Sequence, residues 1–236
     1  MLSYYPLASF GLLGPIAVLW SVVTNLYGRF CLPPLPPLPS PPHCSNKLAI
    51  VTGCNTGIGK ETAQALLDRG CTVILACRSR DKALQAFHNN PKNALFVAPL
   101  DLCDPSSIHR FVQALPNDTT IDILVLNAGR NTSGDSDGLD LCFQANFLGH
   151  WQLVRQLLQD QRLSTATRVV CLSSVMHHFC GDNIHQLDSK EAWKEVLLWR
   201  NNHTTYALSK LAMILLAIEL RTKYGVTAVA VNPGGV

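Results

Sequence analysis

The feature that most constrains the fold is a regular alternation of short apolar runs with amphipathic stretches, which begins at Lys47. Short apolar runs are typical of buried strands, and amphipathic stretches are typical of surface helices. Because parallel strands require crossover connections, usually helices, the alternation predicts an α/β fold, a doubly wound parallel sheet of Rossmann type with helices on both faces. The predicted strands are 49–52, 73–76, 95–99, 121–126, 169–172 and 227–231.

The chain divides into three segments of different composition. No charged residue occurs from Met1 to Gly28, and residues 7–27 form an apolar stretch about as long as a membrane-spanning helix. A membrane helix is favoured over a cleaved signal peptide or a buried core helix, and the prolines that follow favour an extended spacer. The expected segments are a membrane anchor at 1–32, a proline-rich linker at 33–46 and one nucleotide-binding domain at 47–236.

Composition excludes some partners and sites. The formal net charge is only +3 and no run of lysine or arginine occurs, so nucleic acid is not an expected partner. Nine cysteines are scattered without a CxxC pair or a metal-like spacing, so no metal site is expected. Free thiols in a reducing compartment are favoured over a disulfide framework.

A glycine-rich loop lies where the first predicted strand meets the following helix. Glycine allows a tight turn and the close approach of a pyrophosphate, and a helix N-terminus offers unpaired N–H groups and a favourable dipole. A glycine triplet alone is weak evidence, but its place between a strand and a helix favours dinucleotide binding over an ordinary loop. The predicted phosphate-binding residues are Gly53, Asn55, Thr56, Gly57, Ile58 and Gly59.

The residues after the second and third predicted strands indicate which dinucleotide binds. The second strand leads into Arg78, where an NAD site would usually have an aspartate or glutamate for the ribose 2′-hydroxyl. Because arginine can instead bind a 2′-phosphate, NADP(H) is the expected cofactor, with a solvated surface arginine as the alternative. Asp101 and Leu102 follow the third strand and are expected near the adenine. Capping the helix that begins near Pro105 is an equal alternative for Asp101.

A helical segment near the end of the sequence carries Tyr206 and Lys210 four residues apart, hence on one face. A free phenol ionises near pH 10, roughly, so a tyrosine that exchanges a proton at neutral pH needs a nearby cation. Lys210 can supply it, although such a pair alone is more often amphipathic surface. Ser173 and Ser174 end the fifth strand, at the sheet edge where ligands bind, and a serine hydroxyl there can bind a substrate carbonyl.

Taken in order, the phosphate loop, the LNAG sequence at 126–129, Asn146, the serines and the Tyr/Lys pair resemble the short-chain dehydrogenase/reductase family across 47–236. The resemblance implies that Tyr206 is the proton donor and that Lys210 lowers its pKa and binds the cofactor ribose. Ser174, rather than Ser173, would orient the substrate carbonyl.

Other motif residues take their expected roles from the same resemblance. Asn146 would anchor a proton-relay water. The resemblance places five further residues beside the cofactor, namely Asn127, Ala128, Gly129, Pro233 and Gly234.

Within the family, the sequences LACRS, ANFLGHWQL and YALSKLA are most similar to the retinol dehydrogenase-like branch. That similarity implies hydride transfer between NADP(H) and an alcohol or carbonyl, with a lipid-like substrate such as a retinoid or steroid. It also implies attachment to the endoplasmic reticulum membrane. The domain is expected to face the cytosol because Arg29 and Lys47 follow the apolar stretch. A homodimer is a candidate assembly.

Three features depart from the family pattern. Leu126 replaces the first asparagine of the usual NNAG, and the distance from Ser174 to Tyr206 implies an inserted loop at 176–203, either a pocket wall or a surface excursion. The sequence stops soon after Pro233, so the fold is expected to be C-terminally truncated, and this chain is expected to bind NADP(H) weakly and to turn over little or nothing. The alternative function is a non-catalytic NADP(H)-binding or scaffold protein, from a truncated isoform or a partial gene model.

Overall fold

The computed structural model describes residues 44–88, 92–117, 119–132, 134–136, 139–180 and 202–234. The predicted membrane anchor and most of the proline-rich linker lie outside these ranges, as does most of the predicted inserted loop. Within the described ranges, no helix has both the length and the apolar character needed to cross a membrane.

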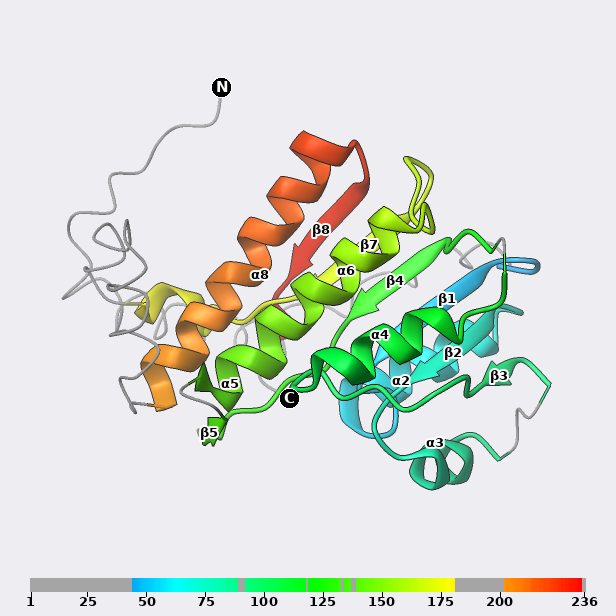
Figure 1. The fold of residues 1–236 in the computed structure, drawn as a ribbon, viewed down its shortest axis with the longest axis horizontal. Coiled ribbons are helices and arrows are strands. Elements are labelled where there is room, and N and C mark those ends of the chain that lie inside the picture. The colour runs from blue at the N-terminus through cyan, green and yellow to red at the C-terminus, as the bar shows by residue number, and fades with distance from the viewer. Residues whose placement is uncertain are drawn as a thin grey trace, which may run out of the picture.

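A six-stranded parallel sheet forms the centre of the domain (Figure 1). Its strand order is β3-β2-β1-β4-β7-β8, so the chain winds outward from β1 first in one direction and then in the other. This arrangement confirms the predicted Rossmann-type sheet. The strands are β1 (Leu48–Thr52), β2 (Thr72–Ala76), β3 (Ala94–Leu95), β4 (Ile123–Leu126), β7 (Arg168–Leu172) and β8 (Thr227–Val231).

Two strands are shorter than predicted. Residues 96–99 do not continue β3, and the proline at 99 has no amide hydrogen to donate to a ladder. Residues 121 and 122 precede β4, since the Ile121 amide donates to the Arg162 carbonyl instead, at 2.9 Å. A separate two-stranded antiparallel pair, β5 (Asp135–Ser136) and β6 (Leu139–Asp140), lies outside the main sheet.

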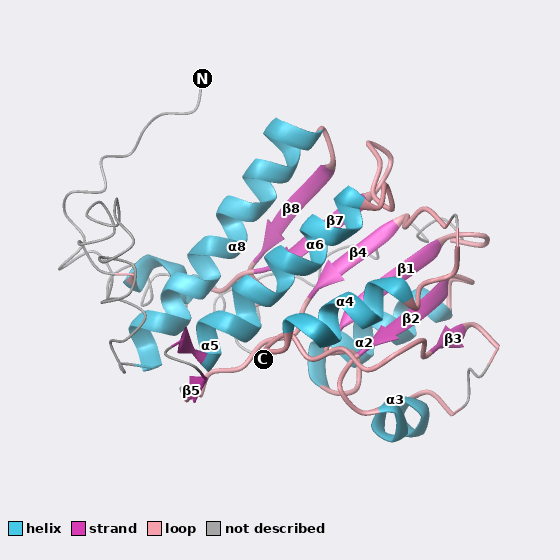
Figure 2. Ribbon diagram, in the orientation of Figure 1, coloured by secondary structure: helices cyan, strands magenta, loops and turns pink. Residues whose placement is uncertain are grey.

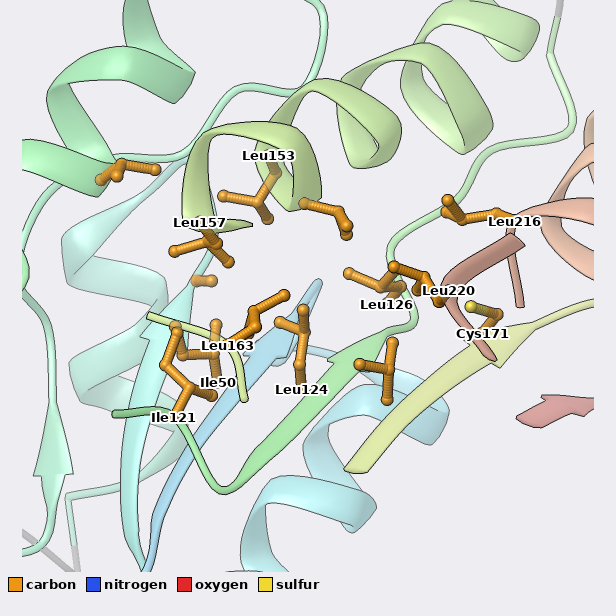
Figure 3. Close-up of a cluster of buried hydrophobic side chains, with 14 of the residues drawn as sticks. Ile50, Ile121, Leu124, Leu126, Leu153, Leu157, Leu163, Cys171, Leu216 and Leu220 are labelled. Atoms are coloured by element: carbon orange, nitrogen blue, oxygen red, sulfur yellow. The ribbon is translucent and has the colours of Figure 1, made fainter. Parts of the chain in front are cut away.

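Helices cover both faces of the sheet (Figure 2). The helical elements are α2 (Gly57–Leu67), α3 (Arg80–Ala86), α4 (Pro105–Gln113), α5 (Leu141–Phe143), the π-helix η1 (Gln144–Leu148), α6 (Gly149–Gln159), the 3₁₀ helix η2 (Val175–Phe179) and α8 (Asn202–Tyr224). The side chains of Ile50, Leu124 and Cys171 pack with α4, α6 and α8 in the largest apolar cluster (Figure 3), while Ala49 and Val51 pack with α2 and α3 on the opposite face. This alternation along β1 is the period of two that a strand buried on both faces requires.

Because all six strands run parallel, their carboxyl ends meet at one edge of the sheet. The segments that follow β1, β2, β4 and β7 therefore lie close together, although they are far apart in sequence. All the residues predicted from the glycine loop, Arg78, LNAG and the serines belong to these segments.

Candidate active site

A cavity of about 720 Å³ lies at the carboxyl edge of the sheet. It extends from the glycine loop to the Tyr/Lys pair on α8, so it brings the predicted cofactor site and the predicted catalytic pair together. Most predicted cofactor residues line it: Gly53, Asn55, Thr56, Ile58, Gly59, Arg78, Asp101, Leu102, Asn127, Ala128, Gly129, Tyr206, Lys210 and Pro233. Four other predicted residues, Gly57, Asn146, Ser174 and Gly234, are not among its lining residues.

The glycine loop connects β1 to the start of α2 and is shaped to accept a phosphate. Thr56 is the N-cap of α2, and its side chain makes no capping hydrogen bond, so it does not cover the first amides of the helix. No acidic residue occupies the first turn of α2. Gly59 is buried, and a Cβ there would collide with the Gly53 carbonyl, so the helix packs tightly against the loop. The chemistry of this site fits a dinucleotide pyrophosphate.

Arg78 follows β2 and lines the same cavity with an exposed side chain. Within the described ranges, no carboxylate forms an ion pair with it. Its guanidinium is therefore available to an anionic ligand in the cavity, such as a phosphate.

Asp101 also lines the cavity, but it does not cap α4. Its carboxylate accepts a hydrogen bond from the Cys103 amide at 2.9 Å. The N-cap of α4 is Asp104, whose carboxylate accepts from the Ser106 amide at 2.8 Å, with Pro105 at the first helical position. The alternative role that the sequence suggested for Asp101 is thus filled by Asp104, because the helix begins one turn later than that role requires.

Tyr206 and Lys210 lie one turn apart on α8, and the Lys210 Nζ is 5.4 Å from the centroid of the Tyr206 ring. Lys210 is buried and donates a hydrogen bond from Nζ to the Leu172 carbonyl at 3.2 Å. Burial lowers the pKa of Lys210 to about 8. Burial raises the pKa of Tyr206, and the hydroxyl of Ser174 opposes that rise. The Ser174 hydroxyl thus favours the ionised form of Tyr206, and the predicted lowering of the tyrosine pKa by Lys210 stays a prediction.

The two serines after β7 have different environments. Ser173 is buried, and its hydroxyl donates to the Lys210 carbonyl at 2.8 Å, which ties the end of β7 to α8. Ser174 is only partly buried, caps η2 by accepting from the Met176 amide at 3.3 Å, and interacts with the Tyr206 hydroxyl. Ser174 is therefore the serine beside the candidate proton donor, whereas Ser173 is the serine that lines the cavity, and the predicted role of Ser174 in orienting a carbonyl stays a prediction.

Asn127 contributes to the sheet edge through its side chain. Its amide nitrogen donates to the Thr52 carbonyl at 2.8 Å, across the gap between β4 and β1. The Thr52 hydroxyl accepts hydrogen bonds from the backbone amides of Asn127 and Ala128, both at 2.9 Å. Sequence reasoning did not single out Thr52, although its position as the last residue of β1 was a usable signal.

Asn146 lies in the π-helix η1 and is buried. Its side-chain oxygen accepts from the Arg130 amide at 2.8 Å, and its side-chain nitrogen donates to the Arg130 carbonyl and to the Ser209 hydroxyl, both at 3.0 Å. These bonds join the loop after β4 to α8. Since both side-chain hydrogens have partners within the protein, a relay water would have to act as a donor to Asn146, at its side-chain oxygen or at its backbone carbonyl.

Several cavity residues were not predicted from the sequence. Most of them lie at or near the carboxyl ends of strands or in the loop after LNAG, so their position at this edge of the sheet was the available signal; Ala145 lies in η1. They are Ala76, Cys77, Leu100, Cys103, Arg130, Asn131, Thr132, Ala145 and Leu172, and Ser173, the less favoured of the two predicted serines, also lines the cavity. Within the described residues no cysteine forms a disulfide, and no group of three or more potential metal ligands occurs there.

Comparison with known proteins places this site in a family. Residues 47–184 match the short chain dehydrogenase family model. The chain belongs to the short-chain dehydrogenase family. Solved structures agree: an uncharacterised protein from Mycobacterium paratuberculosis superposes with a TM-score of 0.66 at 32% identity, covering 82% of this chain and 70% of that one. A short-chain dehydrogenase from Streptomyces avermitilis gives a TM-score of 0.61 at 25% identity, covering 80% and 67%.

Curated relatives confirm the predicted resemblance to the retinol dehydrogenase-like branch. Mouse retinol dehydrogenase 11 is 39% identical over 203 residues, and human retinol dehydrogenase 12 is 37% identical over 199 residues; each match covers 80% of this chain and 61% of the relative. Bovine dehydrogenase/reductase SDR family member 13 is 35% identical over 95% of this chain and 60% of its own length. The chain spans about three fifths of the length of these relatives.

Proposed function

We propose that the protein is an oxidoreductase that transfers a hydride between NADP(H) and an alcohol or carbonyl. The observation that carries the proposal is that one cavity contains the glycine loop, Arg78 and the Tyr206/Lys210 pair. Membership of the short-chain dehydrogenase family supports the reaction class and a nicotinamide cofactor. Arg78 supports the choice of NADP(H), because its guanidinium can make charge-assisted hydrogen bonds with a 2′-phosphate.

The chemistry of the reaction divides between cofactor and protein. The nicotinamide supplies or accepts the hydride when it is bound. We propose that Tyr206 donates a proton to the carbonyl oxygen in the reducing direction; the burial that keeps its hydroxyl protonated supports this role. In this proposal Ser174, beside that hydroxyl, donates a hydrogen bond to the same oxygen. Lys210 supplies positive charge and a hydrogen-bond donor at the cavity wall.

The proposed substrate is a small apolar alcohol or carbonyl, such as a retinoid or steroid. Two of the curated relatives are named as retinol dehydrogenases, and this supports a lipid-like substrate for the present chain. We also propose that the apolar stretch at 7–27 attaches the protein to the endoplasmic reticulum membrane, where such substrates dissolve.

Exchange of the charge at Arg78 tests the choice of cofactor. In Arg78→Asp, the carboxylate repels a 2′-phosphate and can bind a 2′-hydroxyl, so the ratio of NADPH to NADH affinity should fall by at least about tenfold, the equivalent of one charge-assisted hydrogen bond. The ratio is obtained from fluorescence titrations of both cofactors with the purified chain. Arg80→Asp is the matched control, because Arg80 is also exposed but does not line the cavity. Equal ratios in Arg78→Asp and in the wild type would contradict the proposal.

The same titrations separate an enzyme from a binding protein. Tyr206→Phe removes the proton-donating hydroxyl and keeps the ring, so NADPH affinity should change little. Turnover with a panel of lipid aldehydes and ketones should fall by about 10²-fold or more. A wild-type chain that binds NADPH but reduces none of the panel would show a binding protein instead.

A further inference from the structure

His150 is a fully buried polar residue on α6 to which the proposed mechanism gives no role. Its ring connects two parts of the site that are far apart in sequence. Nε2 lies 2.9 Å from the Thr52 hydroxyl at the end of β1, and Nδ1 lies 2.9 Å from the Asn146 carbonyl in η1. One side chain thus contacts both η1, which carries Asn146, and the carboxyl edge of the sheet beside the predicted cofactor site, called the cofactor edge below.

The hydrogen-bond partners determine which ring nitrogen carries the proton. A carbonyl oxygen can only accept, so Nδ1 must be the donor to Asn146. The Thr52 hydroxyl already accepts from the Asn127 and Ala128 amides and has one hydrogen to give, which Nε2 can accept at 2.9 Å. Every donor and acceptor is satisfied when the ring is neutral and protonated on Nδ1.

A charged ring does not fit this site. It would direct a second N–H at the Thr52 oxygen, whose two acceptor positions are already used. Burial without a carboxylate partner lowers the pKa of His150 to about 4, and the positive charge of Lys210 acts in the same direction. The neutral ring therefore persists at physiological pH.

The bond to Asn146 falls in a segment where the helix is widened. The Gly149 amide donates to the Gln144 carbonyl, five residues back, and such π-turns disturb the regular hydrogen-bond ladder of a helix. The side chain of Asn146 is held from the other side by Arg130 and Ser209. His150 therefore fixes the backbone of the same residue whose side chain joins the loop after β4 to α8.

We infer that His150, as the neutral Nδ1–H tautomer, is a positioning residue that holds the Asn146 carbonyl for proton transfer and the Thr52 hydroxyl for cofactor binding. Proton transfer here rests on the proposed function, whereas the cofactor edge and the tautomer do not. The two bonds serve different steps, so they can be removed one at a time.

Asparagine and glutamine each preserve one of the two bonds. The asparagine amide nitrogen stands at the same position along the side chain as Nδ1, so His150→Asn can still donate to the Asn146 carbonyl but cannot reach Thr52. The glutamine amide group stands where Nε2 does, so His150→Gln can still bind the Thr52 hydroxyl but not the carbonyl. His150→Phe removes both bonds and keeps the ring volume.

The control for lost packing is Leu153→Ala, on the same helix and fully buried in the apolar cluster. It should lower Tm without changing kcat or the NADPH Kd of the folded protein. In His150→Gln, kcat should fall about tenfold while the NADPH Kd stays close to wild type, since a tenfold change corresponds to one hydrogen bond. In His150→Asn, the NADPH Kd should rise about fivefold while kcat is largely kept. This effect is smaller than the loss of kcat in His150→Gln because the Thr52 hydroxyl can donate instead to the Val125 carbonyl, at 3.3 Å.

The inference would be overturned if the asparagine and glutamine variants lost kcat and NADPH affinity to the same extent and in proportion to their drop in Tm. Such a result would show that His150 only contributes packing. If the wild type binds NADPH but has no turnover, the proposed function fails. The NADPH Kd values of the asparagine and glutamine variants then test alone whether the bond to Thr52 supports cofactor binding. The tautomer can be read independently of activity from ¹⁵N NMR spectra of protein labelled at histidine. The signals of His150 are those that disappear in the His150 variants. A neutral Nδ1–H ring at pH 7 is expected, and an Nε2–H or doubly protonated ring would contradict the assignment.

Discussion

Burial acts on the two ionisable groups of the proposed catalytic pair in the same sense, since it disfavours the charged form of each. For Tyr206 this raises the pKa and keeps the phenol protonated, which is the form that donates a proton to a carbonyl. For Lys210 it lowers the pKa to about 8, close enough to neutrality for a ligand to change its protonation. An anionic cofactor in the cavity can therefore change the protonation state of Lys210.

NADPH affinity should consequently depend on pH in a defined window. A negatively charged ligand favours the charged lysine and raises its pKa, so binding takes up a proton wherever the free protein has lost it. NADPH affinity should fall as the pH rises through about 8, and below about pH 7 the protonation of Lys210 should no longer change it. Lys210→Met should remove the slope, and Lys223→Met, an exposed lysine on the same helix, should keep it. Titrations from pH 7 to 9.5, roughly, decide this, and an affinity that rises with pH would contradict it.

The two adjacent serines allow a prediction that separates chemistry from stability. Ser174→Ala removes a hydrogen-bond donor beside Tyr206, so kcat/KM should fall about 10²-fold, and it removes the cap of η2, which should cost about 1 kcal/mol or less of unfolding free energy. Ser173→Ala leaves the Lys210 carbonyl without its buried partner, which should cost about 1–3 kcal/mol of unfolding free energy. Denaturant unfolding and steady-state kinetics on both variants are the measurements. A larger kinetic loss in Ser173→Ala than in Ser174→Ala would assign the roles the other way.

Single residues differ in how far the sequence alone reveals them. Tyr206 and Lys210 are separated by one helical turn, and the glycines stand at a strand-to-helix junction, so local spacing is enough to find them. Thr52 and His150 meet across 98 positions, and no local pattern marks such a pair. The start of α4 near Pro105 was predicted, but the sequence did not show that Asp104, directly before it, rather than Asp101, is its N-cap.

At the scale of elements, the sequence predicted where all six strands of the main sheet lie, but it misjudged the ends of β3 and β4. The last strand, β8, has the predicted bounds of 227–231, whereas β3 is much shorter than its apolar run suggested. An apolar run records burial, but a strand also requires a neighbour to bond with. Residues beyond Leu95 turn away, and the Leu100 amide bonds to the Cys77 carbonyl at 3.0 Å instead.

The junction of β1 and α2 gives a prediction about two glycines of the same loop. A Cβ at Gly59 would collide with the Gly53 carbonyl, so Gly59→Ala must displace the loop from the helix, and NADPH binding should be lost. A Cβ at Gly57 meets nothing within 4 Å, and only its positive φ of 55° opposes a side chain. Gly57→Ala should therefore cost about 1–2 kcal/mol of stability and retain binding at low temperature. Thermal unfolding and NADPH titration test the pair, and equal effects would show that contact with Gly53 is unimportant.

On the scale of the whole molecule, the doubly wound order brings together at one sheet edge what the sequence spreads over more than 150 positions, from Gly53 to Lys210. The parallel strands and their crossovers were predictable from alternation alone, and so was the edge at which ligands would bind. Residues 181–201 and 1–43 lie outside the described residues, so the inserted loop, as a pocket wall or as a surface excursion, and the membrane anchor stay predictions.

Orientation at the membrane gives the last prediction. The positive charges nearest the apolar stretch, Arg29 and Lys47, follow it, so the positive-inside rule places the domain in the cytosol. Three Asn-X-Ser/Thr sequences begin at Asn117, Asn131 and Asn202, and the first two asparagines are exposed in the structure. A cytosolic domain never meets the glycosylation machinery, so all three sites should stay unmodified in cells.

The control directs the same domain into the lumen by replacing residues 1–46 with a cleavable secretory signal peptide. There the exposed sites should be glycosylated, which would show that they can accept a glycan. The lack of glycosylation in the natural chain would then reflect its topology. Gel mobility before and after glycosidase treatment reports both cases. A glycosidase-sensitive shift in the natural chain would place the catalytic domain on the lumenal side and reverse the proposed orientation.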